Sequence, residues 1–159
     1  MNREIKFRGK GIADNEWYYG DLIQVESGRV HYFIIQDYEI KEDRIELNTC
    51  ASPEVITETI GQYTGLHDKN GKEIYEGDIV EFEDTGEEGY EYKEGFDFNN
   101  IAQVVYENGI YTLANFGESD NSYYATDCSD EEILEEVLRN GNCKVIGNIY
   151  DNPELLGGE

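Results

Sequence analysis

Two short runs of β-forming residues flank an Asn-Gly pair, and this arrangement constrains the fold more than any other feature of the chain. The runs cover residues 103–106 and 110–113, with Asn108-Gly109 between them. Asn-Gly favours a two-residue hairpin because a type I′ turn requires positive φ at both central residues. The sequence therefore predicts an antiparallel β-hairpin here, and a second Asn-Gly pair at residues 70–71 predicts another.

Most of the remaining chain also reads as short strands separated by turn residues. The expected strands cover residues 5–7, 17–23, 30–35, 44–47, 57–64, 74–82, 102–113 and 143–150. Two Gly-Asp pairs, Gly20-Asp21 and Gly77-Asp78, are interpreted as turns leading into strands. Gly tolerates turn geometry, and Asp accepts hydrogen bonds from nearby backbone N–H groups. This pattern predicts an all-β fold.

One segment, residues 130–139, has helical rather than strand periodicity. Ser129 and Glu132 have the spacing of a capping box at the start of a helix. The apolar residues that follow fall on one stripe of that helix: Ile133, Leu134, Val137 and Leu138. The opposite face is acidic, so we expect a single short helix inserted before the last strand.

The aromatic content argues against a disordered acidic chain. The 159 residues include 13 Tyr and 6 Phe, which supply large buried areas. Disordered acidic chains are poor in aromatic residues. The length fits one compact domain or two small lobes.

The acidic residues are concentrated in one part of the sequence. Between residues 81 and 138 the chain carries seventeen acidic residues and one basic residue, Lys93, in a protein of net charge −24. Such an imbalance indicates a property of partners or solubility rather than of fold.

Three features predict a soluble protein of the cytoplasm. The longest apolar run, residues 32–35, is far shorter than a membrane span of about 20 residues. Residues 1–6 lack the apolar core of a signal peptide. The odd number of widely spaced cysteines, Cys50, Cys128 and Cys143, is typical of reduced thiols.

Three stretches resemble the YopX family of small phage and prophage proteins. The central one is residues 58–82 (ETIGQYTGLHDKNGKEIYEGDIVEF). The start (REIKFR at 3–8, YGDL at 19–22) and the end (VIGNIYDNPELL at 145–156) match as well. The resemblance is weakest between residues 83 and 144.

The resemblance implies an SH3-like barrel and a phage or prophage origin, but no activity and no catalytic residues. On this basis residues 1–55 would form an N-terminal β segment packed on a barrel of residues 56–159. An acidic insertion at 83–142 would belong to the barrel, and the whole would form one compact unit.

The residues offer little for metal, cofactor or covalent chemistry. Asp68, Asn70, Gly71 and Glu73 do not match an EF-hand loop, in which Gly is the sixth residue, so a turn explains them. His31 and His67 are isolated, and no Cys-x-x-Cys pair or nucleophile elbow occurs. We therefore expect no cofactor and no metal.

Direct nucleic-acid binding is also not expected, because phosphate neutralisation dominates that affinity and the chain is strongly anionic. The one basic stretch, residues 3–10, is interpreted as a solvated strand face.

The favoured function is a non-enzymatic phage accessory protein that binds a host or phage protein through an acidic surface. One alternative is a DNA-mimicking inhibitor of a host nuclease or defence enzyme, whose carboxylates would imitate a phosphate backbone. Another is a hydrolase that uses carboxylates in the barrel mouth.

The predicted contact combines acids with aromatic anchors such as Tyr123 and Tyr124. Its residues are Glu81, Glu83, Asp84, Glu87, Glu88, Tyr90, Glu91, Tyr92, Glu94, Asp130, Glu131, Glu132, Glu135 and Glu136. The partner would be a basic, DNA-binding protein or another macromolecule, and exposed sheet edges would also allow pairing with a second copy.

Overall fold

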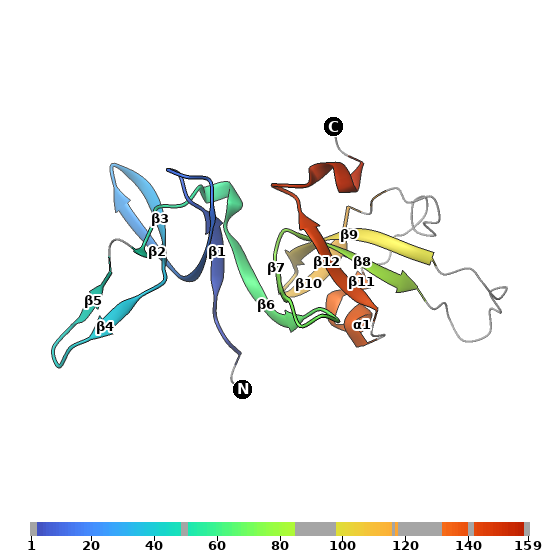
Figure 1. Cartoon of the computed structure of the whole chain (residues 1–159), viewed down its shortest axis with the longest axis horizontal. Coiled ribbons are helices and arrows are strands. Elements are labelled where there is room, and N and C mark those ends of the chain that lie inside the picture. Colours follow the sequence, from blue (N-terminus) through green and yellow to red (C-terminus); the bar gives the residue numbers. More distant parts are fainter. Residues whose placement is uncertain are drawn as a thin grey trace. The chain divides into compact units, whose positions relative to one another are not determined.

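The computed structural model describes residues 3–48, 51–84, 98–115, 117, 132–139 and 142–157, which form two compact units. The first unit comprises residues 1–65 and the second residues 66–159, so residues 56–65 belong to the first. Figure 1 shows that β-strands dominate both, and the described residues include one α-helix. The expected all-β fold with one short helix is confirmed, whereas closure into an SH3-like barrel stays a prediction. Within the described residues, no helix has the length and apolar character required to cross a membrane.

Antiparallel strands form the first unit. They are β1 (Phe7–Lys10), β2 (Trp17–Ser27) and β3 (Arg29–Ile35), followed by β6 (Gly61–His67), which pairs with β1 at its first residues. β2 and β3 form a long hairpin whose register runs from Asp21 opposite Ile35 to Ser27 opposite Arg29. Buried apolar side chains support it at Ile34, Ile35, Val55 and Tyr63.

Gly20 lies inside β2, so the interpretation of Gly20-Asp21 as a turn is wrong. A Cβ atom at residue 20 would lie 2.1 Å from the carbonyl oxygen of Ile35. The glycine is therefore needed because the backbone of β3 approaches β2 closely at this point.

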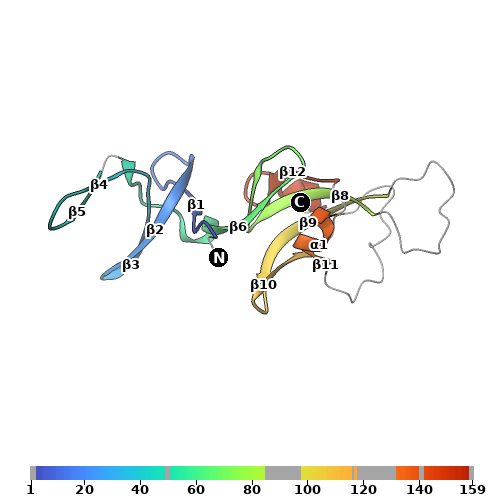
Figure 2. The same ribbon diagram turned by 90° about the horizontal axis from the view of Figure 1, so that it is seen from below.

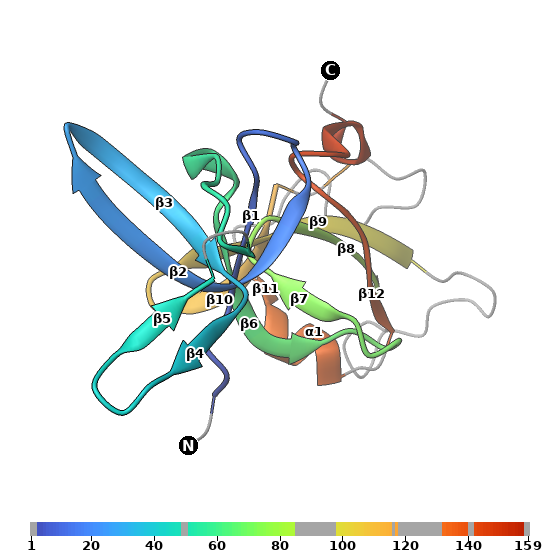
Figure 3. The ribbon, with the colours of Figure 1, turned by 60° about the vertical axis from the view of Figure 1, so that its left-hand side comes forward.

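A second, separate hairpin follows in the first unit. β4 (Tyr38–Ile40) pairs with β5 (Ile45–Leu47), which confirms the strand expected at 44–47. Together they make a two-stranded sheet that shares no edge with β2 and β3. Figure 3 shows the two hairpins extending in different directions. A short 3₁₀ helix, η2 (Thr57–Thr59), then leads into β6, so the strand expected at 57–64 begins at Gly61 instead.

The second unit contains a five-stranded antiparallel sheet in the order β11-β10-β9-β8-β12. Its strands are β8 (Asp78–Asp84), β9 (Phe98–Glu107), β10 (Ile110–Ala114), β11 (Glu132–Ile133) and β12 (Cys143–Asn148). The unit also contains β7 (Glu73–Tyr75), the helix α1 (Leu134–Arg139) and a 3₁₀ helix, η3 (Pro153–Leu156). Figure 2 shows the curvature of β8, β9 and β10.

The core of the second unit follows from strand alternation. Val80 and Phe82 of β8 and Ala102 and Val104 of β9 are i, i+2 pairs that point to the same side of the sheet. α1 contributes Leu134 and Val137, and the cluster is completed by Ile74, Leu113 and Cys143. Each fully buried Val, Ile, Leu or Phe side chain contributes about 1.5–3 kcal/mol relative to exposure.

The hairpin predicted at Asn108-Gly109 is confirmed. Asn108 has φ of 52° and Gly109 has φ of 85°, which are the two positive values that a type I′ turn requires. Tyr106 and Tyr111 face each other across this hairpin with ring centroids 5.0 Å apart. A cross-strand aromatic pair adds to the stability of the ladder.

The hairpin predicted at Asn70-Gly71 is confirmed, because β6 and β7 are hydrogen-bonded neighbours in one sheet. Its turn is not of type I′, since of these two residues only Gly71 has positive φ, at 80°. Residues 68–72 form a longer connection, in which the Asp68 carboxylate accepts hydrogen bonds from the N–H groups of Asn70 and Lys72, both at 2.9 Å. The interpretation of these residues as a turn rather than a calcium loop agrees with this geometry.

The helix predicted at 130–139 begins only at Leu134. Glu132 and Ile133 form β11 instead, with Ile133 opposite Thr112 and Glu132 opposite Leu113. Tertiary pairing along β10 overrides the local helical preference, and the β-branched Ile133 suits a strand. The capping box is therefore wrong at Glu132, and Ser129 lies outside the described residues.

Candidate protein-binding site

The acidic surface predicted from the sequence is only partly covered by the structure. Among the predicted contact residues, the side chains of Glu81, Glu135 and Glu136 are described. Glu83, Asp84 and Glu132 have described backbone only, in β8 and β11. The others lie outside the described residues: Glu87, Glu88, Tyr90, Glu91, Tyr92, Glu94, Asp130 and Glu131, together with Tyr123 and Tyr124. A continuous acidic face thus stays a prediction.

Two of these described acids form ion pairs within their own unit. Glu81 of β8 lies 3.2 Å from the Lys144 ammonium of β12, directly across the ladder. Glu135 lies 3.0 Å from the Arg139 guanidinium, one helical turn away. Exposed pairs of this kind contribute little, about 0–1 kcal/mol. Their charges are partly neutralised, which weakens them as recognition groups.

The solvated strand face predicted for the basic stretch at residues 3–10 is wrong for its second half. Arg3 is exposed and Lys6 half-buried, but Arg8 is 4% exposed and Lys10 is 9% exposed. The Arg8 guanidinium lies 4.7 Å and the Lys10 ammonium 5.5 Å from the Trp17 ring centroid. Both cations pack on one aromatic ring, an interaction that favours their burial over exposure to solvent.

The β4–β5 hairpin carries the most prominent apolar surface of the described chain. Tyr38 pairs with Leu47 and Ile40 with Ile45, so alternation places all four on one side of the hairpin. Their exposed fractions are 48% and 42% for the first pair, and 76% and 63% for the second. We call these four side chains the apolar face. All six strand residues are exposed, so the described chain covers neither side of the hairpin.

Charged residues surround the apolar face. Glu39 and Glu46 alternate to the opposite side of the hairpin, where Lys41 pairs with Glu39 and Arg44 with Glu46. Glu42 and Asp43 form the tip, which the backbone hydrogen bond from Lys41 to Arg44 closes at 2.8 Å. Asp37 stands at the base. Five acids and two bases between residues 37 and 46 leave this hairpin with a net negative charge.

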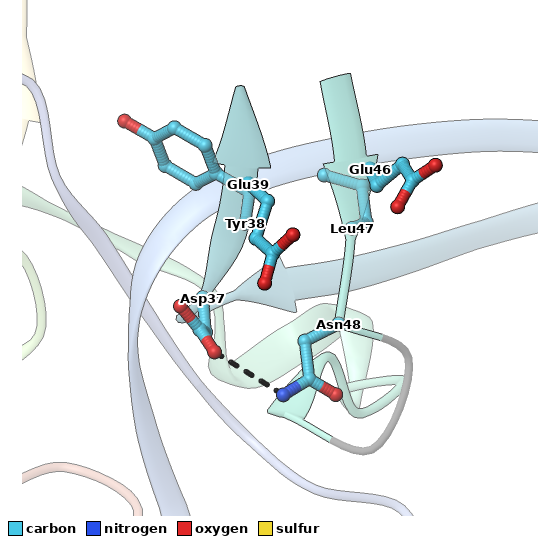
Figure 4. A pocket seen from close by; sticks show the side chains of 6 residues that line it. All are labelled: Asp37, Tyr38, Glu39, Glu46, Leu47 and Asn48. Atoms are coloured by element: carbon cyan, nitrogen blue, oxygen red, sulfur yellow. Dashed lines mark hydrogen bonds between the residues drawn. The ribbon is translucent and has the colours of Figure 1, made fainter. Parts of the chain in front are cut away.

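A hollow of about 230 Å³ lies at the base of the hairpin (Figure 4). It is lined by Asp37, Tyr38, Glu39, Glu46, Leu47 and Asn48. The Asn48 amide donates a hydrogen bond to the Asp37 carboxylate at 3.2 Å, and the Tyr38 ring points away from this pair. Among the three carboxylates of this lining, Glu39 is paired with Lys41 and Glu46 with Arg44, whereas Asp37 has no ion pair among the described residues. Asp37 is therefore the acid of this hollow that is open to a cationic side chain.

A second small hollow of about 170 Å³ lies beside β3, where Glu54 meets the His31 ring and the Arg29 guanidinium. Its carboxylate lies 2.6 Å from Nδ1 of His31 and 3.7 Å from the Arg29 guanidinium. The neighbouring lining residues are largely apolar, including Ile12, Val30 and Val55. His31 is thus held by a carboxylate and by stacking on Phe33 at 6.5 Å, which is a packing role.

In the motifs that resemble the family, the side chains of Asp78 and Asn148 accept hydrogen bonds from nearby backbone N–H groups. Asp78 accepts a hydrogen bond from the N–H of Tyr75 at 2.8 Å, so the Gly77-Asp78 turn is confirmed. Asn148 accepts hydrogen bonds from the N–H groups of Tyr150 and Asp151, at 3.0 and 2.9 Å. Within the described ranges no group of three or more His, Cys, Asp or Glu side chains could hold a metal ion.

Sequence reasoning found β5 but missed β4 and the apolar face. The sequence does contain the pattern of a hairpin. Tyr38 and Ile40 alternate with acidic residues before Glu42-Asp43, and Ile45 and Leu47 alternate with Glu46 after it. Such short runs are easily read as a surface loop when charged residues interrupt them.

Comparisons with known proteins agree with this fold. A family model described as YopX protein matches residues 6–157. Among solved structures, the crystal structure of protein EF1440 from Enterococcus faecalis is similar, with a TM-score of 0.57 and 23% sequence identity. The match covers 98% of this chain and 99% of that one. At this identity the likeness shows a shared fold. No curated protein matches the chain significantly.

Proposed function

The chain belongs to the YopX family, and on this premise we propose that it acts without catalysis, by binding another protein through the apolar face of β4–β5. One observation carries the proposal: four large apolar side chains lie side by side on a hairpin that nothing in the described chain covers. Grouped exposed apolar side chains are typical of interaction sites, whereas single ones are ordinary.

The energetics favour a partner for this hairpin. A two-stranded hairpin is marginally stable by itself, and β4–β5 has no third strand among the described residues. Covering Ile40 and Ile45 would remove the two most exposed side chains of the apolar face from water. Each such burial contributes on the order of 1 kcal/mol or more, so a partner would stabilise both the complex and the hairpin.

The same hairpin is poorly suited to catalysis or to a small ligand. The hollow of about 230 Å³ is smaller than ligand sites of roughly 300–1,000 Å³. Its carboxylates stand on exposed strands, where water weakens every electrostatic interaction. This supports recognition over catalysis at the β4–β5 hairpin.

The acid-rich sequence between residues 81 and 138 enters the same proposal as a source of attraction. A chain of net charge −24 draws a basic partner over a long range and raises its association rate. The predicted contact acids would then determine how fast the complex forms, and the apolar face how long it lasts. Replacing Glu87, Glu88, Glu91 and Glu94 by Gln should slow association and weaken its salt dependence.

We also propose that the protein is a phage or prophage accessory protein that works in the host cytoplasm. The family resemblance supports the origin. The free, buried thiol of Cys143 is in keeping with a reducing compartment.

Capture from a bacterial lysate with three baits tests the proposed function. The baits are the native protein, the double variant Ile40→Ser/Ile45→Ser, and Ile5→Ser as a control. Ile5 is 65% exposed, close to the 63% of Ile45, but lies outside the hairpin. We expect a protein retained by the native and control baits and lost from the double variant. Equal recovery on all three baits would contradict binding through the apolar face.

A further inference from the structure

We infer that the occupant of the apolar face is an amphipathic helix of about three turns with Lys or Arg at both ends. This inference rests on the proposed function and names the chemistry of the partner. It follows from the dimensions of the hairpin and the placement of its charges.

The dimensions of the apolar face match one side of a helix. Residues i and i+2 of a strand stand roughly 6.8 Å apart, and directly opposite residues about 4.5–5.5 Å apart. The four side chains therefore form a block of two by two. Apolar residues at i and i+4 of a helix lie about 5–6 Å apart. A helix laid along the hairpin would thus place an apolar stripe between the Tyr38–Leu47 pair and the Ile40–Ile45 pair.

The acids mark the two ends of this block. Asp37 precedes the apolar face at the base, and Glu42 follows it at the tip. Neither carboxylate has an ion pair to a cation among the described residues, whereas Asp43 is paired with Arg44 at 3.3 Å. β4 spans Tyr38–Ile40 and Glu42 stands in the bend at the tip, so the five residue steps from Asp37 to Glu42 cover at most about 17 Å. A helix rising 1.5 Å per residue covers that distance in about eleven residues.

The hollow at the base gives one basic end a specific place. A Lys or Arg side chain at this end would meet Asp37, since Glu39 and Glu46 are already paired with Lys41 and Arg44. The aliphatic stem of that side chain could lie along Leu47 while its charged end stays beside the Asp37 carboxylate.

Charge disfavours the other occupants. A second copy would bring another acidic hairpin, and another chain of net charge −24, against the first. An anionic membrane surface would be repelled for the same reason. A strand added to the edge of β4 or β5 would leave the apolar face in water, because the added strand lies beside the sheet and not on it.

Defined peptides test the helix. One 14-residue helical peptide carries a Leu stripe with Lys at both ends, a second has the same stripe with Glu at the ends, and a third has the first composition with the stripe scrambled. Each is titrated into isotopically labelled protein while backbone amide shifts are followed. We expect the Lys-ended peptide to perturb residues 37–47 and to bind at least about tenfold more tightly than the others, since each 1.4 kcal/mol is tenfold.

Matched variants separate the contribution of the apolar face from that of the acids at its two ends. Ile40→Ser/Ile45→Ser should weaken the Lys-ended peptide about tenfold or more, and Ile5→Ser should not change it. Asp37→Asn with Glu42→Gln should reduce the advantage of Lys over Glu ends to within about threefold, because the charge pairing is lost.

Three results would overturn the inference. The first is equal affinity for Lys-ended and Glu-ended peptides, or amide shifts centred outside residues 37–47. The second is sedimentation as a dimer that Ile40→Ser/Ile45→Ser abolishes, which would make the occupant a second copy. The third is binding of phosphatidylcholine–phosphatidylglycerol vesicles through the same residues. If the peptides fail while capture still depends on Ile40 and Ile45, the helix is wrong and the proposed function stands.

Discussion

The carboxylate of Asp68 accepts a hydrogen bond from the backbone N–H of Val145 at 2.9 Å, across 77 positions of sequence. The same carboxylate holds the N–H groups of Asn70 and Lys72. One side chain therefore organises the turn before β7 and also joins that turn to β12. Burial by itself would raise the pKa of Asp68, but the hydrogen bonds from Val145, Lys72 and Asn70 lower it below its ordinary value.

Asp68→Asn should destabilise the second unit by about 1–3 kcal/mol at pH 7, because an amide NH₂ cannot accept a hydrogen bond from an N–H group. A lowered native pKa stabilises the fold above the unfolded pKa of about 3.9, and this contribution disappears as the pH falls through the lower native value. Urea unfolding followed by far-ultraviolet circular dichroism should show a constant deficit above pH 5 that shrinks below pH 4. A deficit unchanged at pH 3 would contradict this account.

Gly20→Ala should destabilise the first unit by at least about 3 kcal/mol, because the new Cβ would meet the backbone oxygen of Ile35, which cannot move without breaking the β2–β3 ladder. Trp17 is the single tryptophan and lies in this unit, so its fluorescence during denaturant unfolding reports the change. Gly28→Ala is the comparison: Gly28 has φ of 71° and no neighbour within 4 Å, so its cost is only conformational, about 1–2 kcal/mol. Equal costs for the two variants would refute the steric explanation.

Cys143 should resist alkylation in the native protein. Burial raises the pKa of its thiol to about 12, and the negative charge of Asp68 adds to the shift. At pH 8 almost no thiolate is present, and the group is 1% exposed. In a Cys50→Ser/Cys128→Ser background, modification by iodoacetamide should proceed only as fast as the second unit opens, and urea should accelerate it. Rapid labelling without denaturant would show that this thiol is accessible.

Ile40→Ser/Ile45→Ser should change the free energy of unfolding by less than about 0.5 kcal/mol per site, because both side chains already face water. Ile74→Ala, by contrast, should cost about 2–5 kcal/mol, since Ile74 is fully buried in the second unit. Thermal and urea unfolding of both variants supply the comparison. A large loss for the double variant would mean that the apolar face supports the fold itself.

Amide hydrogen exchange should be fastest in β4 and β5 among the described strands. A two-stranded hairpin with both sides in water opens at little cost, whereas β8 and β9 lie inside a five-stranded sheet. Mass spectrometry of exchanged peptides would compare residues 38–47 with 78–84. The Lys-ended helical peptide should slow exchange in the first segment only. Equal protection of both segments without peptide would contradict the open hairpin.

Local chemistry explains which elements the sequence could predict. The hairpin at Asn108-Gly109 depends on the backbone preferences of two adjacent residues, and β12 on a compact run of β-forming residues. The start of α1 could not be predicted from local sequence. Ile133 is drawn into a strand because it pairs with Thr112 of β10, about twenty residues earlier in the chain. Gly20 is similar, since only the position of Ile35 shows why a glycine is needed there.

The candidate site was harder to predict because exposure is a tertiary property. Tyr38, Ile40, Ile45 and Leu47 lie in short runs interrupted by charged residues, and only the structure shows that they form one apolar face that the described chain leaves uncovered. The burial of Arg8 and Lys10 on Trp17 was missed for the converse reason, since charged residues at alternate positions suggested a surface. The acid-rich sequence predicted a property of charge, and charge alone does not specify a contact.

The hydrogen bond between Asp68 and Val145 also has a consequence for folding during translation, because the two residues are synthesised far apart in time. The first unit comprises residues 1–65, and β6 ends only two residues later at His67, so this unit can fold while translation continues. The sheet of the second unit waits for β12, which pairs with β8 only when the polypeptide is nearly finished. A nascent chain stalled shortly before Cys143 would therefore carry a completed amino-terminal unit that already includes β4–β5. Its carboxy-terminal unit would still lack the edge strand β12.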